Sequence, residues 1–120
     1  MLKILVIDDE LNIVKVIASR LRANAYEVVT AANGQEGLEK AQGEKPDLII
    51  LDVLMPGMNG FEVLQKLKIG QETSAIPVIM LTCEGQTGNI FQAKDSRAID
   101  YIIKPFDPEE LLRLIRRYIG

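Results

Sequence analysis

The chain has 120 residues, of which 48% are hydrophobic and 26% are charged, and its formal net charge is −3. This length and composition predict one soluble domain with a hydrophobic core, and the negative charge argues against a duplex-binding surface, which needs clustered lysine and arginine. Histidine is absent, which excludes Ser-His-Asp and Cys-His catalysis, most zinc sites and a phosphohistidine supplied by the chain itself.

Signals that send a protein to a membrane or out of the cell are not recognisable in the sequence. No apolar stretch approaches the ~20 residues that span a bilayer. The first ten residues, MLKILVIDDE, lack the basic segment and the long apolar core of a signal peptide. The single cysteine, Cys83, cannot form an internal disulfide. We therefore expect a cytoplasmic protein that does not contact membranes.

Five short apolar runs predict β-strands. The runs are continuous rather than alternating, which is typical of strands buried on both faces of a parallel sheet. They comprise Ile4–Ile7, Val28–Ala31, Leu48–Leu51, Val78–Leu81 and Tyr101–Ile103.

Segments with apolar residues at helical spacing separate these runs and predict helices. Asp107 and Pro108 suit the cap and the first turn of the last helix. The alternation predicts an α/β fold, a doubly wound five-stranded parallel sheet with five helices, over a single domain of residues 1–120. The helical patterns include residues 13–21, 36–42, 61–67 and 111–119.

Polar side chains follow four of the five predicted strands. Asp8 and Asp9 follow the first strand, and Asp52 ends the third. Thr82 ends the fourth strand, and the fifth leads to Lys104. Open parallel sheets bind ligands beyond the carboxyl ends of their strands, so we expect these side chains to gather at one edge.

The chemistry of this group favours a phosphoryl site. Carboxylates of Asp8, Asp9 and Asp52 would repel one another by roughly 4 kcal/mol per pair, at ~4 Å and an effective dielectric near 20. A cluster of oxygen ligands without histidine or cysteine is best neutralised by Mg²⁺. With Lys104 as a second cation and the hydroxyl of Thr82 nearby, Asp52 is the candidate nucleophile.

Four fragments in this order, KILVIDDE, LDVLMPGMNGFEVL, PVIMLTCE and DYIIKPF, resemble the receiver domain of two-component response regulators, in particular the chemotaxis regulators. The resemblance covers essentially the whole chain. It implies a flavodoxin-like sheet with the strand order 2-1-3-4-5, and a receiver domain over residues 1–120.

The resemblance also implies roles for individual residues. Asp52 would be the phosphoacceptor. Asp9 would bind Mg²⁺ directly, Asp8 mainly through water, and Leu54 through its backbone carbonyl. An apolar Leu54 cannot position a hydrolytic water beside Glu84, so we predict a long-lived phosphorylated form.

The switch residues are implied in the same way. Thr82 would be the switch hydroxyl, and Tyr101 the aromatic side chain that moves with it. Lys104 would be the phosphate-binding lysine, preceding a cis peptide bond to Pro105.

As a member of this family, the domain would accept its phosphoryl group from a sensor histidine kinase or a histidine phosphotransfer protein. It would then change its binding to a downstream output domain or protein, and a phosphorylation-dependent homodimer is one open form of that output. It would catalyse only its own phosphorylation and dephosphorylation, and would bind no nucleic acid itself.

Two other functions stay open. A magnesium-dependent phosphatase of the haloacid-dehalogenase type would use Asp52, but this class needs a second aspartate where Leu54 stands. A pseudo-receiver would serve only for docking. For single residues, Asp8 and Asp9 can instead cap a helix, and Thr82 can be an ordinary strand residue, as can Tyr101.

The sequence departs from the family pattern ahead of the fifth strand. Arg97 stands where the family commonly has a glycine in a left-handed conformation, which costs another residue about 1 kcal/mol or more. Gly85 and Gly88 weaken the start of the preceding helix. We therefore predict a reshaped helix end and an atypical output face.

Overall fold

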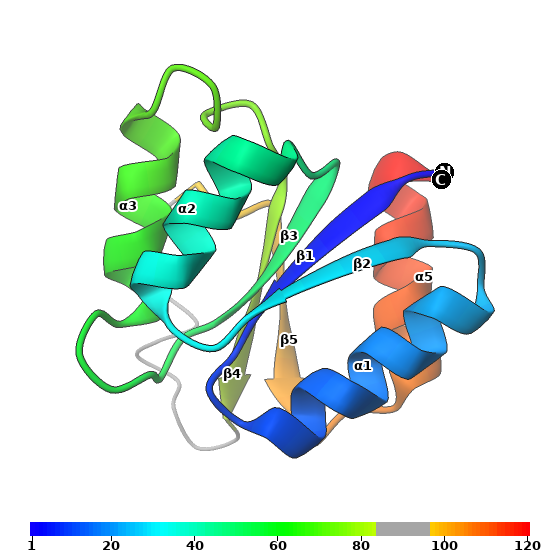
Figure 1. Ribbon diagram of the computed structural model, residues 1–120. Helices are drawn as coiled ribbons and strands as arrows, with labels where there is room; N and C mark the ends of the chain where they lie inside the picture. Colours follow the sequence, from blue (N-terminus) through cyan, green and yellow to red (C-terminus); the bar gives the residue numbers. More distant parts are fainter. Residues whose placement is uncertain (84–96) are drawn as a thin grey trace.

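The structure, a computed structural model, describes residues 1–83 and 97–120. Strands and helices alternate as predicted (Figure 1). The fourth predicted helix, with Glu84, Gly85 and Gly88, lies outside the described residues. The strands are β1 (Lys3–Ile7), β2 (Glu27–Ala31), β3 (Leu48–Asp52), β4 (Val78–Cys83) and β5 (Asp100–Lys104). The helices are α1 (Leu11–Ala23), α2 (Gly34–Glu44), α3 (Gly60–Ile69) and α5 (Pro108–Ile119).

The strands form one parallel sheet in the order β2-β1-β3-β4-β5, which confirms the predicted doubly wound, flavodoxin-like fold. Ile4 of β1 lies between Val28 of β2 and Leu48 of β3. On the other side of β3, Thr82 of β4 pairs with Ile103 of β5. Because all strands run in the same direction, their carboxyl ends meet at a single edge of the sheet.

Helices cover both faces of the sheet, α1 and α5 on one face and α2 and α3 on the other (Figure 1). Successive strand residues point to opposite faces. In β1, Ile4 and Val6 therefore belong to the core beneath α1 and α5, whereas Leu5 and Ile7 belong to the core beneath α2 and α3. All four side chains are fully buried, which explains the continuous apolar pattern of the strand.

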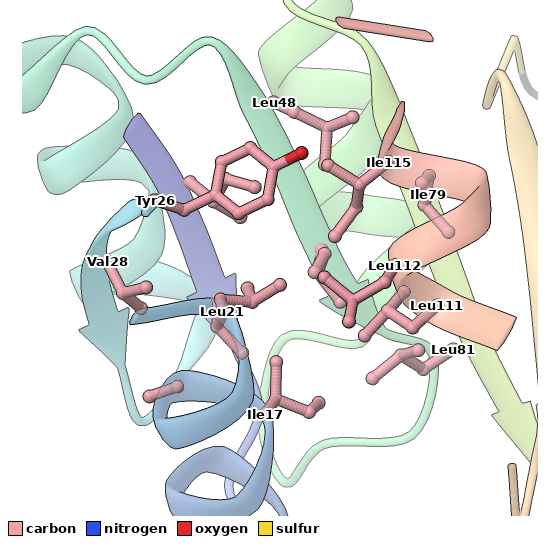
Figure 2. Packing of buried hydrophobic residues seen from close by; sticks show 14 of the residues in the cluster. Ile17, Leu21, Tyr26, Val28, Leu48, Ile79, Leu81, Leu111, Leu112 and Ile115 are labelled. Atoms are coloured by element: carbon pink, nitrogen blue, oxygen red, sulfur yellow. The ribbon is translucent and has the colours of Figure 1, made fainter. Parts of the chain in front are cut away.

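Figure 2 shows the core on the α1–α5 side, where Ile17 and Leu21 of α1 approach Leu112 and Ile115 of α5 over the strands. Each of these side chains is at most 1% exposed. Burying one leucine or isoleucine contributes roughly 1.5–3 kcal/mol. This packing holds the sheet rigid beneath the edge at which the polar residues lie.

Two helices, α3 and α5, begin shortly after strands that end at this edge. The Asp107 carboxylate accepts a hydrogen bond from the backbone N–H of Glu109, and Pro108 lies in the first turn of α5, as predicted. The α3 helix starts with a capping box, in which Asn59 and Glu62 each accept a hydrogen bond from the other's backbone N–H, at 3.0 and 3.3 Å. This cap fixes the start of α3 shortly after β3 ends.

Arg97 has φ +73°, so it adopts the left-handed conformation that the family resemblance implies for a glycine at this position. The predicted reshaping concerns the helix before Arg97, which lies outside the described residues, and it stays a prediction. Within the described residues no helix is long and apolar enough to cross a bilayer.

Candidate functional site

The polar residues at the carboxyl edge come from three different strands. Asp8 directly follows β1, Asp52 is the last residue of β3, and Lys104 is the last residue of β5. All three side chains are buried. Lys104 is 96 residues from Asp8 and 52 from Asp52 in the sequence, so only the parallel sheet brings them together.

The backbone around Asp52 is held by the start of α3. The N–H of Gly60 donates a hydrogen bond to the carbonyl of Val53 at 2.8 Å. A Cβ atom at Gly60 would overlap the backbone carbonyl oxygen of Asp52. Only glycine allows this close approach, which places the first turn of α3 directly against the end of β3.

The ammonium group of Lys104 is surrounded by three carboxylates. Its Nζ atom lies 3.0 Å from Oδ2 of Asp8, 3.1 Å from Oδ1 of Asp52 and 3.3 Å from Oε1 of Glu10. The side chains of Asp8 and Asp52 are 0% and 3% exposed, whereas that of Glu10 is 57% exposed. Asp8 is further fixed because its Oδ1 accepts a hydrogen bond from the Glu10 backbone N–H at 2.9 Å.

Burial and the neighbouring charges change the pKa values of Asp52 and Lys104. Burial raises the pKa of Asp52, the charge of Asp8 raises it further, and Lys104 opposes both, so that the pKa is about 7. For Lys104, burial disfavours the charged form, but hydrogen bonds and charges from Asp8 and Asp52 outweigh it and raise the pKa. The lysine is thus a permanent cation, and the Asp52 carboxyl titrates near neutral pH.

The other predicted site residues lie around this group. Asp9 is exposed, and it is outside the close carboxylate group formed by Asp8, Glu10 and Asp52, whose oxygens lie within 4.8 Å of one another. Leu54 follows Asp52 by two residues, and its side chain is half exposed. The direct metal contact predicted for Asp9 stays a prediction, as does the carbonyl ligand of Leu54.

Thr82 and Tyr101 occupy the neighbouring strands β4 and β5. Thr82 is only 2% exposed. Alternation along β4 places it on the same face as Met80, in the core beneath α2 and α3. Tyr101 is partly buried and packs against that core as well. The predicted switch pair therefore shares one face of the sheet. The peptide bond between Lys104 and Pro105 is cis, as predicted.

The sequence of the chain matches a known protein family. Residues 4–116 match the response regulator receiver domain. The chain belongs to this family. The family resemblance stated from the four fragments of sequence is confirmed.

Individual relatives agree with the family match. The receiver domain is 38% identical to the structure of the chemotaxis protein CheY4 of Vibrio cholerae, with a TM-score of 0.92 and 99% of each chain covered. It is 39% identical to Protein PilH of Pseudomonas aeruginosa over 120 residues, covering all of this chain and 99% of that protein.

A probable transcriptional regulator, ycf27 of Cyanophora paradoxa, is 46% identical over 114 residues. The match covers 95% of the receiver domain but only 46% of that regulator. The chain thus spans about half the length of this and several other curated relatives that it matches.

The side chains of the receiver domain fit a magnesium ion. Asp8, Glu10 and Asp52 offer an all-oxygen donor set, which suits a hard divalent cation. The raised pKa of Asp52 reflects burial and the charge of Asp8, and a cation would relieve this repulsion. The acidic cluster is therefore compatible with Mg²⁺ binding.

Glu10 is the site residue that the sequence predictions did not assign. It comes directly after Asp8 and Asp9, and its side chain turns back from the start of α1 to Lys104. The signal in the sequence that could have indicated Glu10 is the run of three consecutive acidic residues after the first strand. Sequence spacing does not show which of the three side chains turn toward the lysine, because this depends on the backbone of the turn.

An apolar cavity of about 600 Å³ opens beside the carboxylate cluster. It lies between α1 and the segment that joins β5 to α5. Its wall includes Glu10 and Lys104 from the cluster, with Ile13, Val16 and Phe106 beyond them. Val16 is 56% exposed.

Proposed function

We propose that this receiver domain is a phosphorylation-dependent signalling switch whose phosphoacceptor is Asp52. The observation that carries the proposal is the side chain of Asp52, which is buried at a strand end beside Asp8 and bonded to Lys104 at 3.1 Å. Burying two carboxylates together opposes folding, so their presence at the ligand-binding edge favours a functional role.

In the proposed reaction, a carboxylate oxygen of Asp52 forms a bond to phosphorus while the bond from phosphorus to the donor breaks. The electron pair of that bond leaves with the donor, on a histidine nitrogen of a phosphorylated protein or on the acetate of acetyl phosphate. The ammonium of Lys104 stabilises negative charge on the phosphoryl oxygens.

Asp8 and Asp52 supply the buried side chains that would hold Mg²⁺, and the family resemblance adds Asp9 and the carbonyl of Leu54. When bound, the ion supplies positive charge that favours ionised Asp52 and offsets the charge of the transferred group. Lys104, at the end of β5, supplies part of the same positive charge.

The switch is proposed to involve Thr82 and Tyr101. A phosphoryl group on Asp52 offers new acceptor oxygens, which draw in the hydroxyl of Thr82. Movement of Thr82 lets the ring of Tyr101 turn inward, on the face of the sheet that both residues share. The population then shifts toward a state with a different outer surface.

The phosphoryl donor lies outside these 120 residues, because they contain no histidine. We propose a sensor histidine kinase or a histidine phosphotransfer protein, which would approach across the apolar cavity beside Glu10 and Lys104. The output is a downstream domain or protein, and a homodimer formed on phosphorylation is one form of it. We further propose a cytoplasmic module over residues 1–120 that labels and resets itself without being a turnover enzyme.

The decisive experiment is incubation with acetyl phosphate and Mg²⁺, followed by intact-mass measurement of the wild type and Asp52→Ala. We expect the mass of one phosphoryl group on the wild type and none on the variant. No label on the wild type would favour a docking module without phosphorylation. Turnover of an added phosphate ester would favour the phosphatase, although Leu54 occupies the position of its second aspartate.

A further inference from the structure

Lys104 has no N–H left for a phosphoryl group in this structure. An ammonium has three donors and no acceptor. The three close carboxylates of Asp8, Asp52 and Glu10 account for all of them, at 3.0, 3.1 and 3.3 Å. If Lys104 is to contact a phosphoryl oxygen, one of these partners must leave.

Two of the three partners are held in place. Asp8 is fully buried, and its second oxygen accepts the backbone N–H of Glu10 at 2.9 Å. Asp52 is buried at the end of β3 and is itself the group that reacts. Until Asp52 bonds to phosphorus, moving either side chain away from Lys104 would leave a buried carboxylate without this counter-ion, so the arriving phosphoryl group has to take the donor of the third partner.

Glu10 is the partner that can leave. Its side chain is 57% exposed and makes the longest of the three contacts. Glu10 is the N-cap residue of α1, yet its side chain makes no capping hydrogen bond. It can rotate into water without breaking the helix start, and an ion pair to such an exposed carboxylate contributes little.

We propose that Glu10 is a positioning residue that occupies the third donor of Lys104 until a phosphoryl group displaces it. The proposal rests on the proposed function of Asp52. Glu10 also borders the cavity beside the site, so its negative charge faces a donor that approaches from there. A small anionic donor such as acetyl phosphate has to compete with this carboxylate for Lys104.

The test compares labelling rates of the wild type and Glu10→Gln with acetyl phosphate, at Mg²⁺ concentrations that saturate each protein. We expect the variant to react about 3- to 10-fold faster at low ionic strength, with the difference shrinking in high salt because screening weakens charge repulsion. Glu39→Gln on α2 is the matched control, because it removes the same charge from an exposed residue that bonds Gln35.

Each outcome separates this proposal from the function on which it rests. Absence of label on wild-type Asp52 would overturn the function itself. Label on Asp52 with equal rates for Glu10→Gln and Glu39→Gln, or a difference that salt does not change, would overturn the role of Glu10. A crystal structure with beryllofluoride and Mg²⁺ gives a second readout: we expect Glu10 to be turned away from Lys104, and an intact contact would contradict the proposal.

Discussion

Asp52 lies in surroundings that oppose its own charge. Burial and the carboxylate of Asp8 raise its pKa to about 7, although Lys104 is only 3.1 Å away. An apolar residue of similar size would avoid this conflict, so the sequence keeps a destabilising group where its chemistry is needed. At the scale of single residues, the charge of one ammonium group offsets part of the repulsion among three carboxylates.

This balance predicts the pH dependence of stability without Mg²⁺. The pKa of Asp52 is raised on folding from 3.8 to about 7, so the folded state holds a proton that the unfolded state releases. Relative to Asp52→Asn, the wild type should therefore lose about 2–4 kcal/mol of unfolding free energy between about pH 4 and pH 8, with little further change above. Urea unfolding of both proteins across this range measures the difference. A constant difference would contradict the raised pKa.

Leu54 bears on the lifetime of the phosphorylated form. Its side chain is 50% exposed two residues beyond Asp52, and an apolar group there cannot hold a water molecule for hydrolysis. We expect Leu54→Asn to lose its phosphoryl group several-fold faster than the wild type. The decay of labelled protein, followed by intact mass after removal of the donor, checks this. Equal decay rates would show that Leu54 does not control hydrolysis.

At the scale of elements, the junction between β3 and α3 positions the phosphoacceptor. The capping box of Asn59 and Glu62 starts the helix, and Gly60 lets its first turn lie against the carbonyl of Asp52. The site is thus built from short connections between rigid elements.

The segment that precedes β5 shows the opposite case, because one of its residues has a backbone conformation that its side chain disfavours. Arg97 has φ +73°, and burial, together with the charge of Arg97, lowers the pKa of Lys68. Arg97→Gly removes the backbone strain and the charge next to Lys68. Glycine also gives the unfolded chain more entropy, which offsets part of this gain, so we expect the unfolding free energy to rise by about 0.5–1 kcal/mol. Thermal unfolding checks this, with Arg97→Ala as the control that removes the charge and keeps the backbone strain. A glycine variant no more stable than the alanine variant would contradict the argument.

For the whole molecule, binding at the site is coupled to folding, because the carboxylates meet only in the folded sheet. A ligand at 100 times its dissociation constant adds about 2.7 kcal/mol of stability. For Mg²⁺ we therefore expect the melting temperature of the wild type to rise by roughly 10 °C over that in a chelator. Asp52→Asn should show a much smaller rise. Equal shifts for both proteins would place the ion elsewhere.

Much of this protein could be predicted from its sequence. Continuous apolar runs such as Leu48–Leu51 predicted strands buried on both faces, and their alternation with helical segments predicted the parallel sheet. The polar residues at the strand ends, including Asp8, Asp52 and Lys104, were predicted to gather because parallel strands share one carboxyl edge. These inferences succeed because strand burial and chain direction are already visible in local patterns.

The tertiary structure alone decided which side chains share the ammonium of Lys104. The sequence offers Asp8, Asp9 and Glu10 in a row, and the fold turns Asp8 and Glu10 toward the lysine while Asp9 is exposed. The direction of each side chain depends on the backbone between β1 and α1 and on a partner 94 or more residues away. A local pattern shows where the acidic residues are, but only packing between distant segments determines which of them contact the ammonium of Lys104.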